Sequence, residues 1–167
     1  MFEIVDILMV EHSLIRQISG WIRTDDSPQF GEFRSYVKDC HIEIEEKLVF
    51  PVILESIPDQ MANESTRVKQ IQADHKLLLK LSENLDRWIE KGDQSLIRER
   101  APLYIRLLKD HNANEDKFVF RWWNPSDHSH ENDVIREASS VIENFGVDRY
   151  LAITGASKEL FEKMFKK

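Results

Sequence analysis

A chain of 167 residues is long enough to bury a core without disulfides, and its net charge of −7 argues against nucleic acid as a partner. The single cysteine, Cys40, excludes an intrachain disulfide and suits a reducing compartment. Acids interrupt the apolar start, no basic stretch precedes it, and no apolar run reaches the length of a membrane span. We therefore expect a cytoplasmic protein without a signal peptide or a membrane partner.

Hydrophobic residues recur at helical spacing in four long segments. We predict four helices, at about 2–23, 30–57, 64–91 and 96–123. Pro51 is expected to kink the second helix or to end its regular hydrogen bonding, and Gly92 is expected to end the third. Weaker helical patterns follow at about 133–144 and 157–165, and the alternation typical of strands is nearly absent. The predicted fold class is therefore all-α.

Long helices with short connections predict an antiparallel up-down-up-down four-helix bundle over residues 1–123. Residues 124–167 then form a short helical C-terminal extension, which packs on the bundle or makes a dimer contact. Trp122 and Trp123 are expected to close the end of the bundle against this extension.

Two ten-residue stretches are similar enough to be copies of one motif: HIEIEEKLVF at 41–50 and HNANEDKFVF at 111–120. Both copies carry a His and a Glu four residues apart, which places the two side chains on one helical face. The first and third predicted helices each carry one histidine in a matching context, EHSLI around His12 and DHKLL around His75. The chain thus repeats a helical hairpin with one histidine on its first arm and a His–Glu pair on its second.

In an antiparallel bundle these side chains fall into one layer of four imidazoles and two carboxylates: His12, His41, Glu45, His75, His111 and Glu115. Burying two unpaired carboxylates costs several kcal/mol, and a pair of divalent ions offsets that cost. Mixed imidazole and carboxylate ligands favour iron, then manganese or zinc. Six protein ligands leave positions open on two six-coordinate ions, as chemistry with oxygen, peroxide or nitric oxide requires.

Each of these signals has a plainer interpretation when taken alone. A single histidine is usually a surface or core residue, and His–Glu pairs are common on solvated helix faces. The agreement of four segments favours the metal site. Of the nearby tyrosines, Tyr104 is seven residues before His111 and is better phased to contact the layer than Tyr36, five residues before His41.

The segments VEHSLIRQI, HIEIEEKLVFPVI, ADHKLLLKL and LLKDHNANEDKFVF resemble the hemerythrin-like, HHE cation-binding proteins over about residues 1–123. The resemblance implies a four-helix bundle around a non-haem di-iron centre, bridged by two carboxylates and an oxo or hydroxo group. By position, it implies that the ligands are the six residues named above.

The chain departs from the oxygen-carrying members of that family, which have a fifth histidine, often one turn from the third-helix ligand. Ile71 and Leu79 stand at those places here, and His128 and His130 lie outside the matching segments. That place is left to another carboxylate, a tyrosine or water, and reversible oxygen transport is not expected.

Oxygen-carrying members also tend to use a carboxylate five residues after the last histidine, which is Asp116 here. In an ideal helix Glu115 lies about 40° and Asp116 about 140° from His111. Glu115 is therefore preferred, whereas a π-bulge would select Asp116.

Three functions fit such a centre. A binding or sensing protein would hold oxygen, nitric oxide or iron itself. An enzyme would reduce nitric oxide or peroxide, or repair iron–sulfur clusters, as some relatives do. A helical interaction module would use the metal only to stabilise its fold. We favour metal binding with activity toward a small diatomic ligand or peroxide, in a monomer or homodimer.

Overall fold

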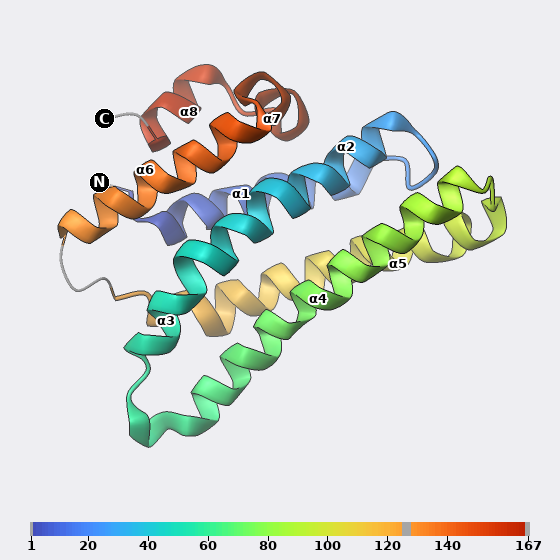
Figure 1. Cartoon of the computed structure of the whole chain (residues 1–167). Helices are drawn as coiled ribbons and strands as arrows, with labels where there is room; N and C mark the ends of the chain where they lie inside the picture. Colours follow the sequence, from blue (N-terminus) through green and yellow to red (C-terminus); the bar gives the residue numbers. More distant parts are fainter. Residues whose placement is uncertain (1, 125–127, 166–167) are drawn as a thin grey trace.

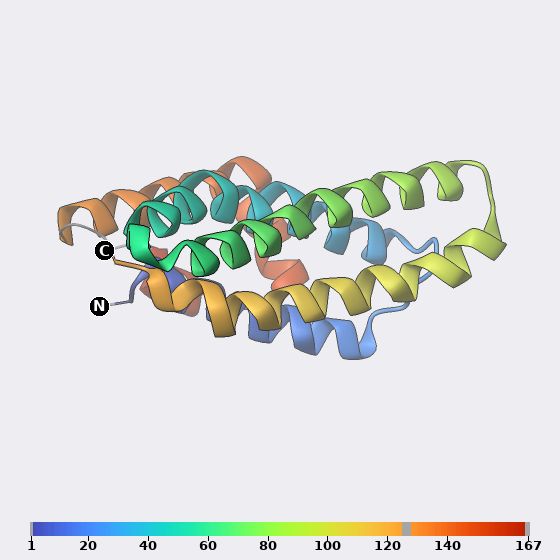
Figure 2. The same ribbon diagram turned by 90° about the horizontal axis from the view of Figure 1, so that it is seen from below.

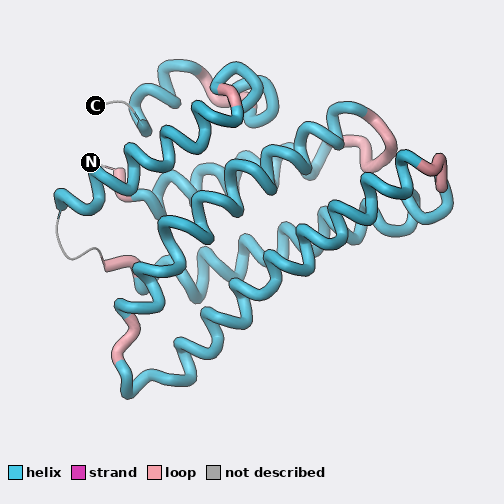
Figure 3. The backbone as a smooth tube through the Cα atoms, in the orientation of Figure 1, coloured by secondary structure: helices cyan, strands magenta, loops and turns pink. Residues whose placement is uncertain are grey.

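The computed structural model describes residues 2–124 and 128–165, and for residues 128–130 it describes the backbone alone. All regular structure within these ranges is helical, so the predicted all-α class is confirmed. The α-helices are α1 Ile4–Trp21, α2 Pro28–Tyr36, α3 Phe50–Ser56, α4 Ala62–Glu90, α5 Gln94–Asn114, α6 His128–Phe145, α7 Val147–Thr154 and α8 Lys158–Phe165 (Figure 1). Within the described ranges, the loops between the helical segments are short (Figure 3).

Two of the long predicted helices contain π-helical segments. α2 continues through the segments Val37–Ile42 and Glu45–Val49 into α3, and α5 continues through Glu115–Val119 into a short 3-10 turn. The sequence predicted continuous helices at these places, with an irregularity at Pro51 and with a π-bulge near Asp116 only as an alternative. Hydrophobic periodicity did not reveal the π segments because one wider turn with i→i+5 hydrogen bonds alters the pattern only locally. Two of the three π segments lie within a copy of the repeated motif, and the third, Val37–Ile42, overlaps the start of the first copy.

The two copies of the repeated motif share one distortion, a π segment of five residues that begins at Glu45 in the first copy and at Glu115 in the second. The N–H of Phe50 donates to the carbonyl of Glu45, and the N–H of Phe120 donates to the carbonyl of Glu115, each five residues back. Pro51 follows only the first copy, where it stands in the first turn of α3. The wider turn is therefore a property of the repeated motif and does not depend on the proline.

α4 and α5 lie side by side and are joined by residues 91–93, so they run in opposite directions (Figures 1 and 2). Gly92 has a φ of 66°, its N–H donates to the carbonyl of Ile89, and the N–H of Asp93 donates to that of Trp88. This is the hydrogen-bond pattern of a Schellman motif, and Gly92 ends the helix as predicted. The finer prediction, an up-down-up-down order of four helices, stays a prediction.

The C-terminal helices pack along the first hairpin. α6 contacts α1 and the π segments after α2, α7 contacts α1 and α2, and α8 packs on α6. Buried Glu131 of α6 accepts hydrogen bonds from the backbone N–H of Ile4, at 2.6 Å, and from the indole N–H of Trp123, at 2.8 Å. One carboxylate thus joins α6 to the start of α1 and to the end of the segment that follows α5.

Candidate metal centre

The structure brings together all six side chains that the sequence predicted, from α1, the π segments of the second arm, α4, α5 and the π segment after it. None of them is more than 2% exposed: His12, His41, Glu45, His75, His111 and Glu115. They therefore form one buried cluster in the interior of the protein.

The cluster consists of two groups of four residues that share both glutamates. We call the group with His12 and His41 the first position and the group with His75 and His111 the second position. Glu45 Oε1 lies 3.4 Å from Nε2 of both His12 and His41, and its Oε2 lies 3.3 Å from Nε2 of His75. Glu45 therefore turns one oxygen to each position.

Glu115 has the corresponding arrangement. Its Oε2 lies 3.4 Å from Nε2 of His12, and its Oε1 lies 3.5 Å from Nε2 of His75 and 3.1 Å from Nε2 of His111. Each position is thus faced by two imidazoles and by one oxygen from each glutamate, so the donor atoms of each position could hold a cation.

The donor atoms of the cluster fit a pair of cations. Both oxygens of Glu45 and of Glu115, and Nε2 of His75 and His111, are buried without a hydrogen-bond partner. Leaving carboxylate oxygens in this state costs several kcal/mol. Two ligand atoms that bind one ion at about 2.1 Å, at an angle of about 90–110°, lie roughly 3.0–3.4 Å apart. The observed separations of 3.1–3.5 Å are close to that range.

Each of the four histidines also directs its second ring nitrogen, Nδ1, toward an acid from another helix. Three contacts are short hydrogen bonds: His12 with Asp116 at 2.7 Å, His41 with Glu11 at 2.8 Å and His75 with Glu46 at 2.6 Å. The fourth, between His111 and Asp74, is 3.8 Å long and is no hydrogen bond. Such partners fix the tautomer and orientation of a ligating imidazole. The sequence reasoning missed them, although each acid directly adjoins a predicted site residue.

The structure places Glu115 between the histidines and Asp116 outside them. Asp116 is half-buried and bonds Nδ1 of His12. The π segment Glu115–Val119 begins at Glu115, so the turn from His111 to Glu115 keeps its α-helical spacing. A π segment is therefore present, but it begins only at Glu115 and so does not bring Asp116 onto the face of the helix that carries His111.

The opposite charges within the cluster shift its pKa values strongly. Burial would raise the pKa of Glu45, but the charge of His41 and the contacts with the other histidines outweigh it and lower this pKa to about 2. Burial would lower the pKa of His75, but its contacts with Glu115, Glu45 and Glu46 raise it to about 12. Without a metal ion the cluster therefore holds protons on histidine, and these protons compete with metal binding.

The shared phenylalanines of the repeat cover the imidazoles. The ring of Phe120 stacks on His12 with centroids 5.4 Å apart, and Phe50 meets His75 edge-on at 5.5 Å. Both are buried core residues, so an apolar ring lies over one imidazole of each position.

Tyr36, and not Tyr104, is the tyrosine next to the cluster. The ring centroid of Tyr36 lies 6.3 Å from that of His41, whereas Tyr104 packs against Phe30 at 6.1 Å. Helical phasing favoured Tyr104. The π segment Val37–Ile42 overturns that order because i→i+5 geometry brings a residue five places before His41 onto its face.

Within the described side chains, the cluster contains four histidines and no fifth. Ile71, one turn before His75, is buried in the apolar core, and Leu79, one turn after it, packs against that core. The side chains of His128 and His130 lie outside the described residues. The departure from the oxygen-carrying pattern therefore holds as far as the structure describes the chain.

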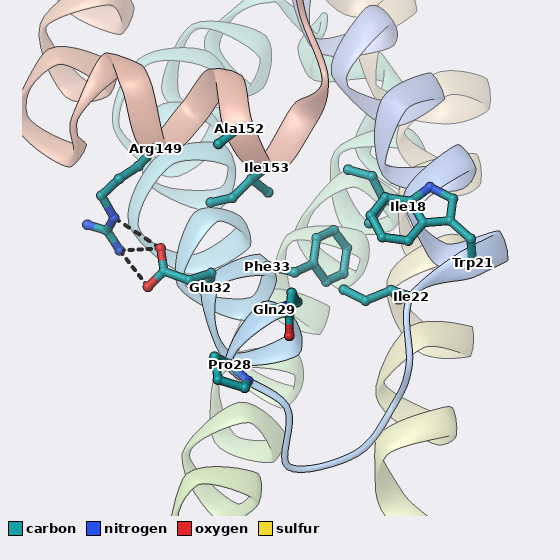
Figure 4. Close-up of a pocket in the computed structure, with 10 residues that line it drawn as sticks. All are labelled: Ile18, Trp21, Ile22, Pro28, Gln29, Glu32, Phe33, Arg149, Ala152 and Ile153. Atoms are coloured by element: carbon teal, nitrogen blue, oxygen red, sulfur yellow. Dashed lines mark hydrogen bonds and ion pairs between the residues drawn. The ribbon is translucent and has the colours of Figure 1, made fainter.

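A pocket of about 310 Å³ lies apart from the cluster, between the connection from α1 to α2 and helix α7 (Figure 4). Its lining is mainly apolar, and the ion pair of Arg149 with Glu32 stands on one side of it. None of the six cluster residues lines it. The pocket is thus no part of the candidate metal centre.

Comparison with protein families supports the resemblance seen in the sequence. The model of the hemerythrin HHE cation-binding domain matches residues 3–123, a range that contains all six cluster residues. Searches of curated proteins and of solved structures found no match. No helix in the described part of the chain is long and apolar enough to cross a membrane. With most of its length matched by that family's model, this chain belongs to the hemerythrin HHE cation-binding family.

Proposed function

We propose that this chain is a cytoplasmic, non-haem di-iron protein that binds or senses oxygen or nitric oxide. In this proposal the six clustered residues are the ligands and residues 1–123 form an antiparallel four-helix bundle. The observation that carries it is the sharing of Glu45 and Glu115 by two groups of histidines, with all four carboxylate oxygens buried and without a hydrogen-bond partner. Membership of a cation-binding family supports the same assignment.

The charges around the cluster suit two divalent ions. Two such ions bring four positive charges, and Glu45 and Glu115 compensate two of them. Three further carboxylates, on Glu11, Glu46 and Asp116, bond the outer nitrogens of the histidines. Glu11, Glu45 and Glu115 are fully buried, and burying three carboxylates together without cations would cost several kcal/mol.

Iron is the metal that this donor set favours. Imidazole nitrogens alone would also suit zinc or copper, whereas carboxylate oxygens suit harder ions. Each position offers two nitrogens and two oxygens, so a six-coordinate ion keeps places for a bridging group and a small ligand. Bound iron would supply electrons to such a ligand, and the apolar cover of Phe50 and Phe120 would keep bulk water away from it.

The test is the optical response of the iron-loaded protein. Protein reconstituted with iron(II) without air is exposed to oxygen or to nitric oxide, and protein loaded with zinc serves as the control. We expect a spectral change with iron that follows ligand binding and no change with zinc. Sustained consumption of nitric oxide or peroxide in the presence of a reductant would instead identify an enzyme. No response to either gas would contradict the proposal.

A further inference from the structure

Two acids occupy equivalent places in the two hairpins but differ in length by one methylene. Glu11 directly precedes His12, and Asp74 directly precedes His75. Each faces Nδ1 of the histidine on the second arm of its own hairpin. Glu11 is fully buried and lies 2.8 Å from His41, whereas Asp74 is 48% exposed and lies 3.8 Å from His111. The longer acid reaches its histidine and the shorter one does not.

His111 is consequently the one histidine of the cluster whose outer nitrogen has no hydrogen-bond partner. A partner at this nitrogen orients the ring and makes it a better ligand, and its loss typically lowers metal affinity about 10–100-fold. The second position, which contains His111, therefore has one poorly fixed imidazole. Both imidazoles of the first position are fixed.

The C-terminal extension increases this difference. Tyr150 of α7 donates a hydrogen bond of 2.7 Å to Oε1 of Glu11, while Oε2 of the same carboxylate bonds His41. All three side chains are buried. α7 is held beside α2 by the two hydrogen bonds from Arg149 to Glu32 (Figure 4). A chain of hydrogen bonds thus runs from the extension to the first position.

The extension acts on one hairpin more than on the other. α6, α7 and α8 lie on the side of α1 and α2, and α4 and α5 lie on the opposite side of the molecule (Figure 1). Tyr150 also lies beyond residues 3–123, the range that the family model matches. The brace on Glu11 is therefore a feature of this chain's extension and not of the matched domain.

From these contacts we infer that the two metal positions are unequal: the ion at the second position exchanges faster than the ion at the first. Asp74 and Tyr150 are the positioning residues that set the difference. Asp74 leaves His111 loosely held, and Tyr150 fixes Glu11 and, through it, His41. The inference rests on the proposed function because it requires a bound pair of ions.

The experiment follows iron release from protein loaded with iron(II) without air and mixed with an excess of a coloured iron(II) chelator. We expect two phases of equal amplitude, one ion each, with rates that differ about 10-fold or more. Asp74→Glu adds the missing methylene and should slow the faster phase alone. Asp110→Glu is the matched control, because Asp110 is exposed and directly precedes His111; it should leave both phases unchanged.

Tyr150→Phe supplies the reciprocal variant, since it removes one hydroxyl and keeps the ring. It should accelerate the slower phase and leave the faster one unchanged. A general loosening of the fold would accelerate both phases, so an equal effect on both would contradict the role assigned to Tyr150.

Two results would overturn the inference while leaving the metal pair intact. One is release of two ions in a single phase, and the other is an unchanged faster phase in Asp74→Glu. A protein that takes up fewer than two ions at saturating iron would contradict the proposed function, and the inference with it.

Discussion

Glu45 and Glu115 stand at equivalent places in the two hairpins, and each directs one carboxylate oxygen to the first position and the other to the second. Neither residue is exposed. Because each position is faced by both carboxylates, we expect the loss of either one to affect the whole centre. The predictions on metal binding follow from this relationship.

Replacing either shared glutamate by its amide should abolish binding of the pair. Glu45→Gln and Glu115→Gln each remove a negative charge and one bridging oxygen, so we expect no more than one ion per chain after iron loading and desalting. Glu43→Gln is the matched control, because Glu43 is partly exposed, pairs with Lys47 and lies two residues from Glu45. Two tightly bound ions in either glutamine variant would contradict the assignment of that residue as a bridge.

The acids around the centre should affect affinity and not stoichiometry. Glu46→Ala and Asp116→Ala each remove the partner of an imidazole Nδ1, so iron binding should weaken about 10–100-fold while two ions still bind at saturation. Competition with a chelator of known affinity measures the change, and Lys47→Ala, at an exposed site, serves as the control. Unchanged affinity in both alanine variants would show that these hydrogen bonds do not hold the rings.

Metal affinity should rise with pH and binding should release protons. His75 has a pKa of about 12 in the metal-free cluster and is protonated at neutral pH, and the pKa of His12 is also raised, by Asp116, Glu115 and Glu45 against the effect of burial. An imidazole must lose its proton from the coordinating nitrogen to bind a metal, so acid favours the metal-free form.

Calorimetry of zinc binding in two buffers with different ionisation enthalpies measures the proton release. We expect about one to two protons released per chain at pH 7, and an affinity that falls as the pH is lowered. A heat of binding that is the same in both buffers would mean that no proton is released. That result would contradict the protonated state of His75 in the metal-free cluster.

The turn between α4 and α5 provides a prediction about stability. Gly92 has a φ of 66°, which an L side chain adopts at a cost of about 1–2 kcal/mol, so Gly92→Ala should lower the free energy of unfolding by that amount. Gly31 lies within α2, and a methyl group there meets nothing within 4 Å, so Gly31→Ala should raise it by about 0.5–1 kcal/mol. Chemical denaturation measures both, and a Gly92→Ala variant as stable as the native chain would contradict the Schellman geometry.

The sequence was sufficient to predict which side chains meet at the cluster. The spacing of His41 and Glu45 is local, it recurs in His111 and Glu115, and helix geometry alone puts each pair on one face. Bringing the two pairs together then required only that the four segments pack with their polar positions at one level. Helical phase carries that information.

The partners of the outer nitrogens could not be predicted in the same way. Glu11 and Asp74 are adjacent to site residues in sequence, but each acts on a histidine of another helix. Their effect depends on the distance between helices and on one methylene of side-chain length. Tyr36 was missed for a related reason, because a π segment changed the phase that a regular helix would have given.

The most direct test of the account is the iron content of the protein after loading with iron(II) without air and removal of unbound metal. We predict two iron ions per chain for the native sequence, and no more than one when Glu45 or Glu115 is replaced by glutamine. A native protein that is folded, binds no iron, and has the same stability whether or not iron is added would contradict the central claim.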